Sequence, residues 1–354
     1  MSLNLKYFKK NKLISLDNFL QDVLYNDNYG YYTKKNPFGT DGDFITAPSI
    51  SSLFGEMLAV WIVLYWENLN KPKNFNIIEL GPGNGSLSRN LIETFRKFPE
   101  FNKTYNFYIY EKSRYLKKIQ KNNINNSKVK WVSHFSGIKK GPVLFMGNEF
   151  FDAIPIKQFE RKNRLIYEYY VCLSRDEKIQ KKLIKATLQN RNDIKKFKSL
   201  KKLNFIEYPK LGFKIINPMI DKINKLGGGM LLIDYGYIHQ KNSSTLQSVK
   251  NHKKNELFSN LGSADITSLV NFELLKDFFK KKKLIVENIV SQSHFLKKVG
   301  ILERAEILSS KMSFKSKADL YLRLKRLLDT DYMGSLFKVI FAHKSKGKKI
   351  IGFN

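Results

Sequence analysis

The stretch from Asn76 to Asn90, NIIELGPGNGSLSRN, constrains the fold of this chain more than any other. A pair of β-branched residues leads into Glu79, a glycine-rich turn follows, and apolar residues then recur at helical spacing. This order predicts a buried strand, a tight turn and the start of a helix. Because glycine has no Cβ atom, such a turn lets a ligand approach the backbone closely, beside the free N–H groups of the helix N-terminus.

The spacing of the glycines separates two classes of ligand. A dinucleotide-binding turn follows G-x-G-x-x-G, but its third glycine would fall at Ser86. The pattern is instead E-x-G-x-G-x-G, which resembles the first motif of methyltransferases that use S-adenosylmethionine (SAM). SAM carries an ammonium and a sulfonium and no pyrophosphate, so a carboxylate at Glu79 favours it. The alternative is a strand–helix turn that binds nothing.

Length and composition bound the organisation of the chain. Its 354 residues and 42% apolar content predict an ordered globule with one large domain and additions, or two domains. We expect an N-terminal helical and lid region over residues 1–70, packed on a SAM-binding domain over 71–354 that has an insertion around 157–226. The single cysteine, Cys172, excludes an internal disulfide and a cysteine-cluster metal site, and we expect no metal. The N-terminus has neither a secretory signal nor the composition of a transit peptide, so we expect a cytoplasmic protein.

The net charge of +32 permits a nucleic-acid or anionic-membrane partner. Lysine is spread along almost the whole chain, however, and only the block from Lys178 to Lys202 is dense. We interpret this block as a solvated insertion in preference to a nucleic-acid patch. No apolar run reaches the length of a membrane span, so we expect no membrane insertion.

The N-terminal part combines helices with a loop rich in aromatics and glycine. Helical spacing predicts one helix over Leu13–Val23 and another over Ile50–Trp66. The segment Tyr29–Ser49 between them is predicted to be an ordered functional loop. We predict a lid over the cofactor that contributes Tyr31, Thr46 and Pro48. In the alternative, its aromatics only seal the edge of the core.

From Phe75 onward, strands and helices alternate, which predicts a mostly parallel α/β sheet. Glu111 follows the strand Phe107–Tyr110, where an acid can accept hydrogen bonds from ribose hydroxyls. Alternatively, it favours the start of the helix near Ser113. We also expect an irregular segment over 245–266. The remaining strands are expected over residues 128–133, ending before His134 and Phe135, and over 142–146, 230–234, 284–290 and 336–343.

Two acids and an amide follow the strand over 142–146. Asn148, Glu149 and Asp152 lie where the carboxyl end of a buried strand meets a ligand crevice. Glu149 and Asp152 are the candidate catalytic residues, although paired acids at strand ends also serve as scaffolding. Asp234 and Tyr235 follow the next strand and are candidates for the wall of the substrate site.

Several longer stretches together resemble the MidA-type family of SAM-dependent methyltransferases, which includes a mitochondrial complex I assembly factor. They are GYYTKKNPFGTDGDFITAPSISSLFGEMLA, IIELGPGNGSL, NEFFDAIPIKQF, GGGMLLIDYGY, ADITSLVNF and MGSLFKVI. The resemblance implies a class I methyltransferase fold with a Rossmann-like sheet, mostly parallel with an antiparallel last strand. It also implies SAM as cofactor and S-adenosylhomocysteine as product. The expected cofactor-binding residues are Glu79, Gly81, Pro82, Gly83, Gly85, Glu111, His134, Phe135 and Asn148.

The resemblance further implies a protein arginine as the methyl acceptor, linked to a subunit of respiratory complex I. An arginine is protonated at any physiological pH, so carboxylates must hold it and favour loss of its proton. Two alternatives stay open: a methyltransferase acting on RNA or a small molecule, and an assembly factor that binds SAM without turnover. We expect a monomer or a homodimer.

Overall fold

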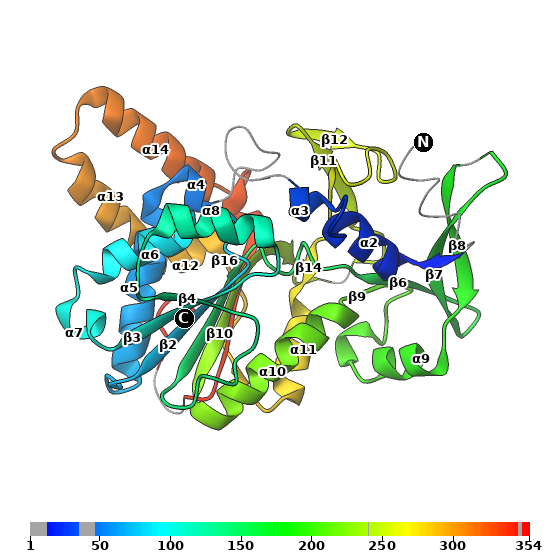
Figure 1. The fold of residues 1–354 in the computed structure, drawn as a ribbon, viewed down its shortest axis with the longest axis horizontal. Helices are drawn as coiled ribbons and strands as arrows, with labels where there is room; N and C mark the ends of the chain where they lie inside the picture. The colour runs from blue at the N-terminus through cyan, green and yellow to red at the C-terminus, as the bar shows by residue number, and fades with distance from the viewer. Residues whose placement is uncertain (1–12, 35–46, 177, 240, 346–348) are drawn as a thin grey trace. The chain divides into compact units, whose positions relative to one another are not determined.

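A computed structural model gives the fold and describes residues 13–34, 47–176, 178–239, 241–345 and 349–354 (Figure 1). The chain forms two compact units, each built from three segments. The first comprises residues 1–37, 151–217 and 237–278, and the second comprises 38–150, 218–236 and 279–354. Among the described residues, no helix combines the length and apolarity that crossing a bilayer requires.

The second unit is built on a mixed sheet with the strand order β15-β17-β10-β5-β2-β3-β4, in which β16 also pairs with β17. The pairs from β10 to β4 are parallel, and β17 is antiparallel to β10. The expected fold class is therefore confirmed. The principal strands are β2 (Phe75–Leu80), β3 (Tyr105–Tyr110), β4 (Val129–Val132), β5 (Val143–Asn148), β10 (Gly228–Tyr237) and β17 (Phe337–His343).

The strand order indicates where an α/β sheet of this kind binds a ligand. The chain runs outward from β2 through β3 to β4 and then returns to the other side of β2 with β5. Where the order reverses, the connections after β2 and β5 leave in opposite directions, and α/β proteins bind ligands beyond the carboxyl ends of those strands. The segments after Leu80 and Asn148 lie at this point.

Helices cover the faces of this sheet, and α5 forms part of the core. Ser51 caps α5 by accepting a hydrogen bond from the Leu53 N–H group at 3.2 Å. The fully buried Trp61 stacks on Tyr65 and meets Phe341 of β17 edge-on, with ring centroids 5.0 Å apart. The helices of this unit are α4 (Ala47–Ile50), α5 (Ser52–Asn68), α6 (Ser86–Phe95), α7 (Pro99–Asn102), α8 (Arg114–Ile124), α12 (Gln292–Val299), α13 (Ile301–Ser309), α14 (Phe314–Leu328) and α15 (Met333–Leu336).

The first unit contains an antiparallel sheet with the order β1-β7-β6-β9, to which β8 adds beside β7. Asn163 and Arg164 join β6 to β7 with left-handed φ angles of 48° and 65°, the geometry of a tight hairpin. Its elements are β1 (Ile14–Ser15), α2 (Leu16–Tyr25), α3 (Tyr31–Lys34), β6 (Lys157–Lys162), β7 (Leu165–Leu173), β8 (Ile179–Lys185), α9 (Leu188–Lys195), η1 (Lys198–Leu200) and β9 (Phe205–Tyr208). The division between the units falls within α10 (Lys210–Leu226) and α11 (Phe272–Lys281).

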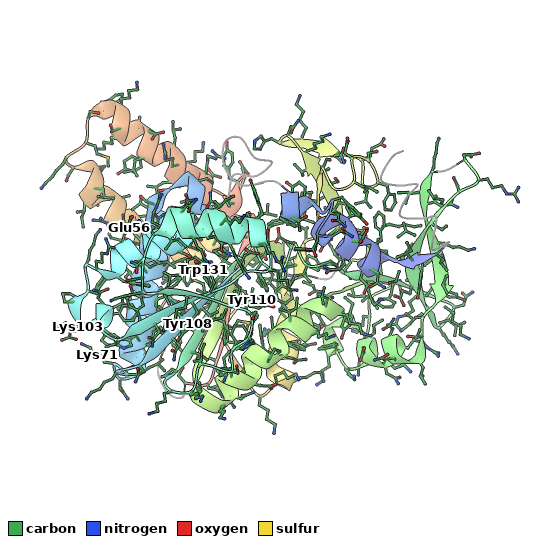
Figure 2. All side chains as sticks on the ribbon, in the orientation of Figure 1. Glu56, Lys71, Lys103, Tyr108, Tyr110 and Trp131 are labelled. Carbon is green, nitrogen blue, oxygen red and sulfur yellow. The ribbon has the colours of Figure 1, made fainter. Side chains whose placement is uncertain are left out.

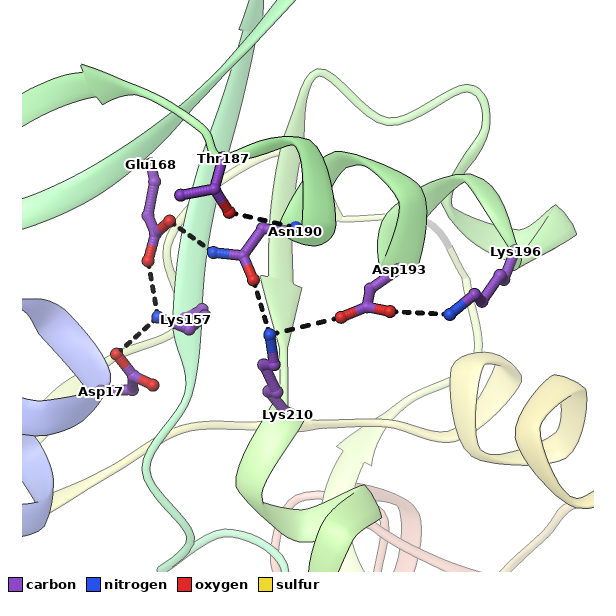
Figure 3. Close-up of polar contacts among 8 residues, drawn as sticks. All are labelled: Asp17, Lys157, Glu168, Thr187, Asn190, Asp193, Lys196 and Lys210. Carbon is purple, nitrogen blue, oxygen red and sulfur yellow. Dashed lines mark hydrogen bonds and ion pairs between the residues drawn. The ribbon is translucent and has the colours of Figure 1, made fainter.

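A buried polar network fixes α2 and α9 on this sheet (Figure 3). The Lys157 ammonium donates to Asp17 at 2.8 Å and to Glu168 at 2.6 Å, and the Asn190 amide donates to Glu168 at 2.7 Å. Burial alone would lower the pKa of Lys157, but its bonds to the two carboxylates raise that pKa overall. The basic block over residues 178–202 is therefore a folded part of the unit, with exposed lysines at 178, 182, 185, 195, 196, 198, 201 and 202.

Three of the expected elements differ from the structure. The helix expected over Leu13–Val23 begins with the short strand β1, so α2 covers Leu16–Tyr25. The segment over 245–266, expected to be irregular, contributes to a small sheet of β11 (Gln247–Lys250), β12 (Lys253–Asn255) and β13 (Asp265–Thr267). These strands are short and rich in polar residues, so they lack the apolar alternation that predicts a strand. The strand expected over 284–290 is split into β15 (Ile285–Val286) and β16 (Val290–Ser291). Four residue steps separate Val286 from Val290, but only three separate their partners on β17, so one residue is left unpaired.

Candidate active site

The glycine-rich turn connects the end of β2 to α6 within the second unit. Gly81, Gly83 and Gly85 have left-handed φ angles of 58°, 57° and 85°, which other residues rarely adopt. The Gly85 N–H group donates to the Pro82 carbonyl at 2.9 Å and closes the turn. A Cβ atom at Gly81 would lie 3.3 Å from the Phe150 ring. The backbone conformation therefore depends on glycine and presents three residues without side chains to a ligand.

Glu79 is a buried acid directly before this turn. Its side chain lies in β2 with 1% of the residue exposed, and it accepts a hydrogen bond from the Ser88 hydroxyl of α6. Burial raises the pKa of Glu79 to about 7, and the bond from Ser88 only partly opposes this effect. The carboxylate is therefore poised to ionise when a cation binds beside it.

Glu111 follows β3, and both of its carboxylate oxygens accept hydrogen bonds. One accepts from the Ser113 N–H group at 2.8 Å, and the other accepts from the Gln120 amide at 3.0 Å. Burial raises the pKa of Glu111, and these two bonds oppose that rise. The carboxylate thus supports the start of α8, as one interpretation expects. It also keeps lone pairs for ribose hydroxyls, as the other expects.

Gln120 was not singled out from the sequence, although it connects three parts of the site. Its fully buried amide donates to the Gly83 carbonyl at 2.9 Å and to Glu111, and its oxygen accepts from the Trp131 indole at 3.0 Å. Trp131 lies on β4 (Figure 2). The available signal was the spacing of α8, because Gln120 falls midway between the buried Leu116 and Ile124 on an otherwise apolar face.

Asn148 ends β5 beside the glycine turn. Leu80 pairs with Gly147, so Asn148 and Gly81 are the next residues along two neighbouring strands. The Asn148 amide nitrogen donates to Glu149 at 3.1 Å. Its oxygen is buried and accepts no hydrogen bond from any of the described residues. A buried acceptor of this kind suits a ligand N–H or O–H group.

Glu149 has a left-handed backbone, with a φ angle of 52°. Its N–H group donates to the Ile233 carbonyl of β10 at 2.9 Å, which fixes the turn after β5. Residues other than glycine, asparagine and aspartate seldom adopt this conformation, and it costs about 1–2 kcal/mol. The backbone of this half-buried acid is therefore fixed at the carboxyl end of the sheet.

Asp152 belongs to the first unit and interacts with residues of that unit. Its carboxylate accepts from the Ala153 N–H group at 2.7 Å, as scaffolding would require. The Tyr32 hydroxyl donates to both oxygens of the buried Asp265, each at 3.0 Å. The pKa of Tyr32 is raised well above its ordinary value, first by burial and then by Asp265, Tyr25 and Asp152. Asp152 therefore lies in a buried, electrostatically coupled group.

The other residues expected to contribute have varied surroundings. Phe135 is buried between Tyr110 and Phe145, whereas the neighbouring His134 is exposed and contacts the Ser136 hydroxyl at 2.8 Å. In the expected lid, Tyr31 is fully buried, Pro48 is partly exposed and Thr46 lies outside the described residues. Asp234 is buried and accepts from the Tyr235 N–H group at 3.0 Å, while the Tyr235 ring packs against Phe337.

The residues around the glycine turn fit SAM. A ligand with an ammonium group, a sulfonium and a ribose diol needs negative charge and acceptors beside an accessible backbone. Glu79 and Glu111 supply carboxylates, Asn148 supplies a buried acceptor, and the turn supplies the backbone. These side chains come from the ends of three adjacent strands of one sheet.

Comparisons with known proteins agree with this fit. A family model described as "Putative S-adenosyl-L-methionine-dependent methyltransferase" matches residues 57–290. The human protein arginine methyltransferase NDUFAF7, mitochondrial, is 27% identical over 350 residues, which cover 92% of this chain and 78% of the relative. The homologue from Caenorhabditis elegans, named in the same way, is 29% identical over 306 residues, covering 78% and 70%.

The fold is shared with a solved structure. A superfamily member from Burkholderia thailandensis, crystallised with S-adenosyl-homocysteine, aligns with a TM-score of 0.81 at 19% identity, covering 99% of this chain and 91% of its own. At this identity the likeness concerns the fold.

One expectation is wrong. We expected a cytoplasmic protein, but the curated relatives from fish, frog, fly and human are all named as mitochondrial proteins. The charge and composition of the first residues therefore did not identify the compartment. The family model spans well over half of the 354 residues, and the protein belongs to this family of SAM-dependent methyltransferases.

Proposed function

We propose that the protein transfers a methyl group from SAM to the guanidinium group of an arginine in a protein acceptor. The relatives named as protein arginine methyltransferases support this acceptor class. The observation that carries the proposal is the turn at Glu149, where a carboxylate is held by a left-handed backbone directly after β5. An acidic side chain kept in a conformation that suits glycine better is typical of a functional site.

The chain's own residues divide the task. Bound SAM supplies a methyl group on a sulfonium, and a neutral thioether leaves, so no acid is needed to protonate the leaving group. Glu79, Glu111 and Asn148 hold and orient the cofactor. Glu149 accepts hydrogen bonds from the guanidinium fork of the acceptor and takes up the proton that the attacking nitrogen loses as the new N–C bond forms. Most of the rate enhancement then comes from positioning and from exclusion of water.

Asp152 is the second carboxylate in the proposal. Its buried group with Tyr32 and Asp265 lies in the first unit, which contains none of the expected cofactor-binding residues. The finer acceptor, an arginine on a complex I subunit, follows from the sequence resemblance and forms part of the same proposal.

The test identifies the acceptor first. The full chain is incubated with methyl-labelled SAM and a lysate of the source organism, and labelled protein is hydrolysed for amino-acid analysis. We expect label in methylated arginine. Label in RNA or in a small molecule would refute the arginine acceptor. SAM binding without any labelled product would favour an assembly factor without turnover.

Variants then test the residue roles on the identified acceptor. Glu149→Gln keeps the shape and removes the charge, and we expect it to lower kcat by about 10²–10⁴-fold, with SAM affinity changed by much less. Glu303→Gln, an exposed acid on α13, is the matched control and should transfer at the wild-type rate. Wild-type turnover by folded Glu149→Gln would leave Glu149 as scaffolding.

A further inference from the structure

Helix α14 has an apolar face that does not pack on the rest of its unit. Leu324 and Leu327 are buried at 3% and 0% exposure, whereas Phe314, Tyr321 and Leu322 are 89%, 43% and 64% exposed. At about 100° per residue, Leu322 points about 140–160° away from Leu324 and Leu327, Phe314 lies about midway between Leu322 and Leu324, and Tyr321 borders the buried face about 60° from Leu324. The apolar surface of the helix therefore extends beyond the part that the unit covers, from Tyr321 at its edge through Phe314 to Leu322 on the opposite side.

The apolar surface continues around the hairpin that α13 and α14 form. Figure 1 shows this hairpin in orange, extending away from the sheet of the second unit. Met312, in the connection between the helices, is 38% exposed, and Ile307 on α13 is 65% exposed. Single exposed apolar residues are common on protein surfaces, but a group of this kind on one projecting element marks an interaction site.

The same segment is strongly basic. Residues 310–328 contain six basic residues and one acid, a net charge of +5, and the acid Asp319 pairs with Arg323 at 2.9 Å. Three lysines flank the most exposed aromatic, Phe314, along the chain. The basic residues are Lys311, Lys315, Lys317, Arg323, Lys325 and Arg326.

The exposed apolar side chains and the positive charge of this hairpin together favour one class of partner. A second copy meeting this hairpin symmetrically would bring a charge of +5 against +5. A nucleic acid would use the lysines but would leave Met312, Ile307 and Leu322 without apolar partners. An anionic lipid surface satisfies both features, because apolar side chains enter the acyl boundary while lysine stems reach the headgroups. We propose that the α13–α14 hairpin docks the protein peripherally on anionic membranes.

The test uses the full chain and vesicles of phosphatidylcholine, with and without phosphatidylglycerol. We expect sedimentation with the anionic vesicles only, weakened by salt. Leu322→Ser and Phe314→Ser should each lower the partition coefficient by about tenfold. Leu188→Ser is the matched control, because Leu188 is 65% exposed on α9 of the other unit, and it should bind like the wild type.

A second pair of variants separates local charge from the overall charge of +32. Lys315→Gln/Lys317→Gln should weaken vesicle binding more than Lys182→Gln/Lys185→Gln, which removes the same charge from β8. Phe314→Trp adds an insertion probe, and quenching of its fluorescence by brominated acyl chains is expected. SAM binding by every variant provides the folding control.

Several outcomes would overturn the proposal. Vesicle binding that is unchanged in both serine variants would show that the hairpin does not insert. If Phe314→Ser instead lowers the oligomer mass in sedimentation analysis, the apolar face belongs to a second copy. Loss of RNA binding in the lysine pair, with vesicle binding intact, would assign the basic residues to nucleic acid.

Discussion

Replacing Glu79 with glutamine should change how the stability of the second unit depends on pH. Glu79 is 1% exposed, and burial raises the pKa of its carboxyl group from the ordinary 4.5 to about 7. The folded state therefore keeps this proton up to about pH 7, whereas the unfolded chain loses it near pH 4.5. Between these values the folded state binds more protons, so the free energy of unfolding falls as pH rises.

The difference between the two pKa values sets the magnitude. A shift from 4.5 to about 7 is about 2.5 units, and at about 1.4 kcal/mol per unit it corresponds to about 3 kcal/mol. This contribution is fully present below about pH 4.5 and is lost as pH rises through 7. A glutamine side chain carries no charge at any pH, so the unfolding free energy of the variant has no such loss. The unfolding free energy of Glu79→Gln, relative to that of the wild type, should therefore rise by up to about 3 kcal/mol between pH 4.5 and 8.

Urea unfolding followed by tryptophan fluorescence is a suitable assay. The three tryptophans, Trp61, Trp66 and Trp131, all belong to the second unit and therefore report the unit that contains Glu79. Other groups titrate identically in both proteins and cancel in the difference. A difference in unfolding free energy that stays constant from pH 4.5 to 8.5 would refute the reasoning.

Two further predictions concern the cofactor end of the sheet. Gln120→Leu should lower affinity for S-adenosylhomocysteine by about tenfold or more, because Glu111 and the Gly83 carbonyl each lose a buried donor. Calorimetry with the 2′,3′-dideoxy analogue should show that Gln120→Leu lowers affinity for this ligand much less. An equal loss of affinity for both ligands would contradict the prediction that Glu111 binds the ribose hydroxyls. Gly81→Val should lower the unfolding free energy by at least about 1–2 kcal/mol, because φ is 58° and Cβ would press on Phe150. A thermal melt equal to the wild type would contradict it.

Local patterns in the sequence were sufficient for the cofactor half of the fold. The strand, turn and helix around Glu79 are encoded by neighbouring residues, since β-branched residues, glycines and helical spacing each act over a few positions. The apolar run over 336–343 predicted the last strand, and the family resemblance implied its antiparallel direction, which is confirmed in β17. Glu79 near the end of β2 and Glu111 after β3 were found because strand ends converge at one edge of a parallel sheet.

Contacts between distant residues were not accessible in this way. The bond from Ser88 to Glu79 and the bonds from Gln120 depend on how α6 and α8 pack on the sheet. The left-handed backbone at Glu149 is hidden as well, because glutamate gives no local signal for positive φ. The tertiary structure explains this backbone, because the Glu149 N–H group donates to the Ile233 carbonyl of β10. These tertiary constraints distinguish the candidate site from an ordinary strand–helix turn.

The division of the chain into two units separates Asp152 from the residues that are expected to bind the cofactor. All nine residues expected to bind the cofactor lie between positions 79 and 148, within one segment of the second unit. Asp152, Asp265 and Tyr32 belong to the first unit and share none of the hydrogen bonds described around Glu79 and Glu111. A substitution such as Asp152→Asn therefore alters none of the hydrogen bonds described around Glu79 and Glu111. A change in methyl transfer without a change in cofactor affinity would then support the proposed role of Asp152 with the acceptor.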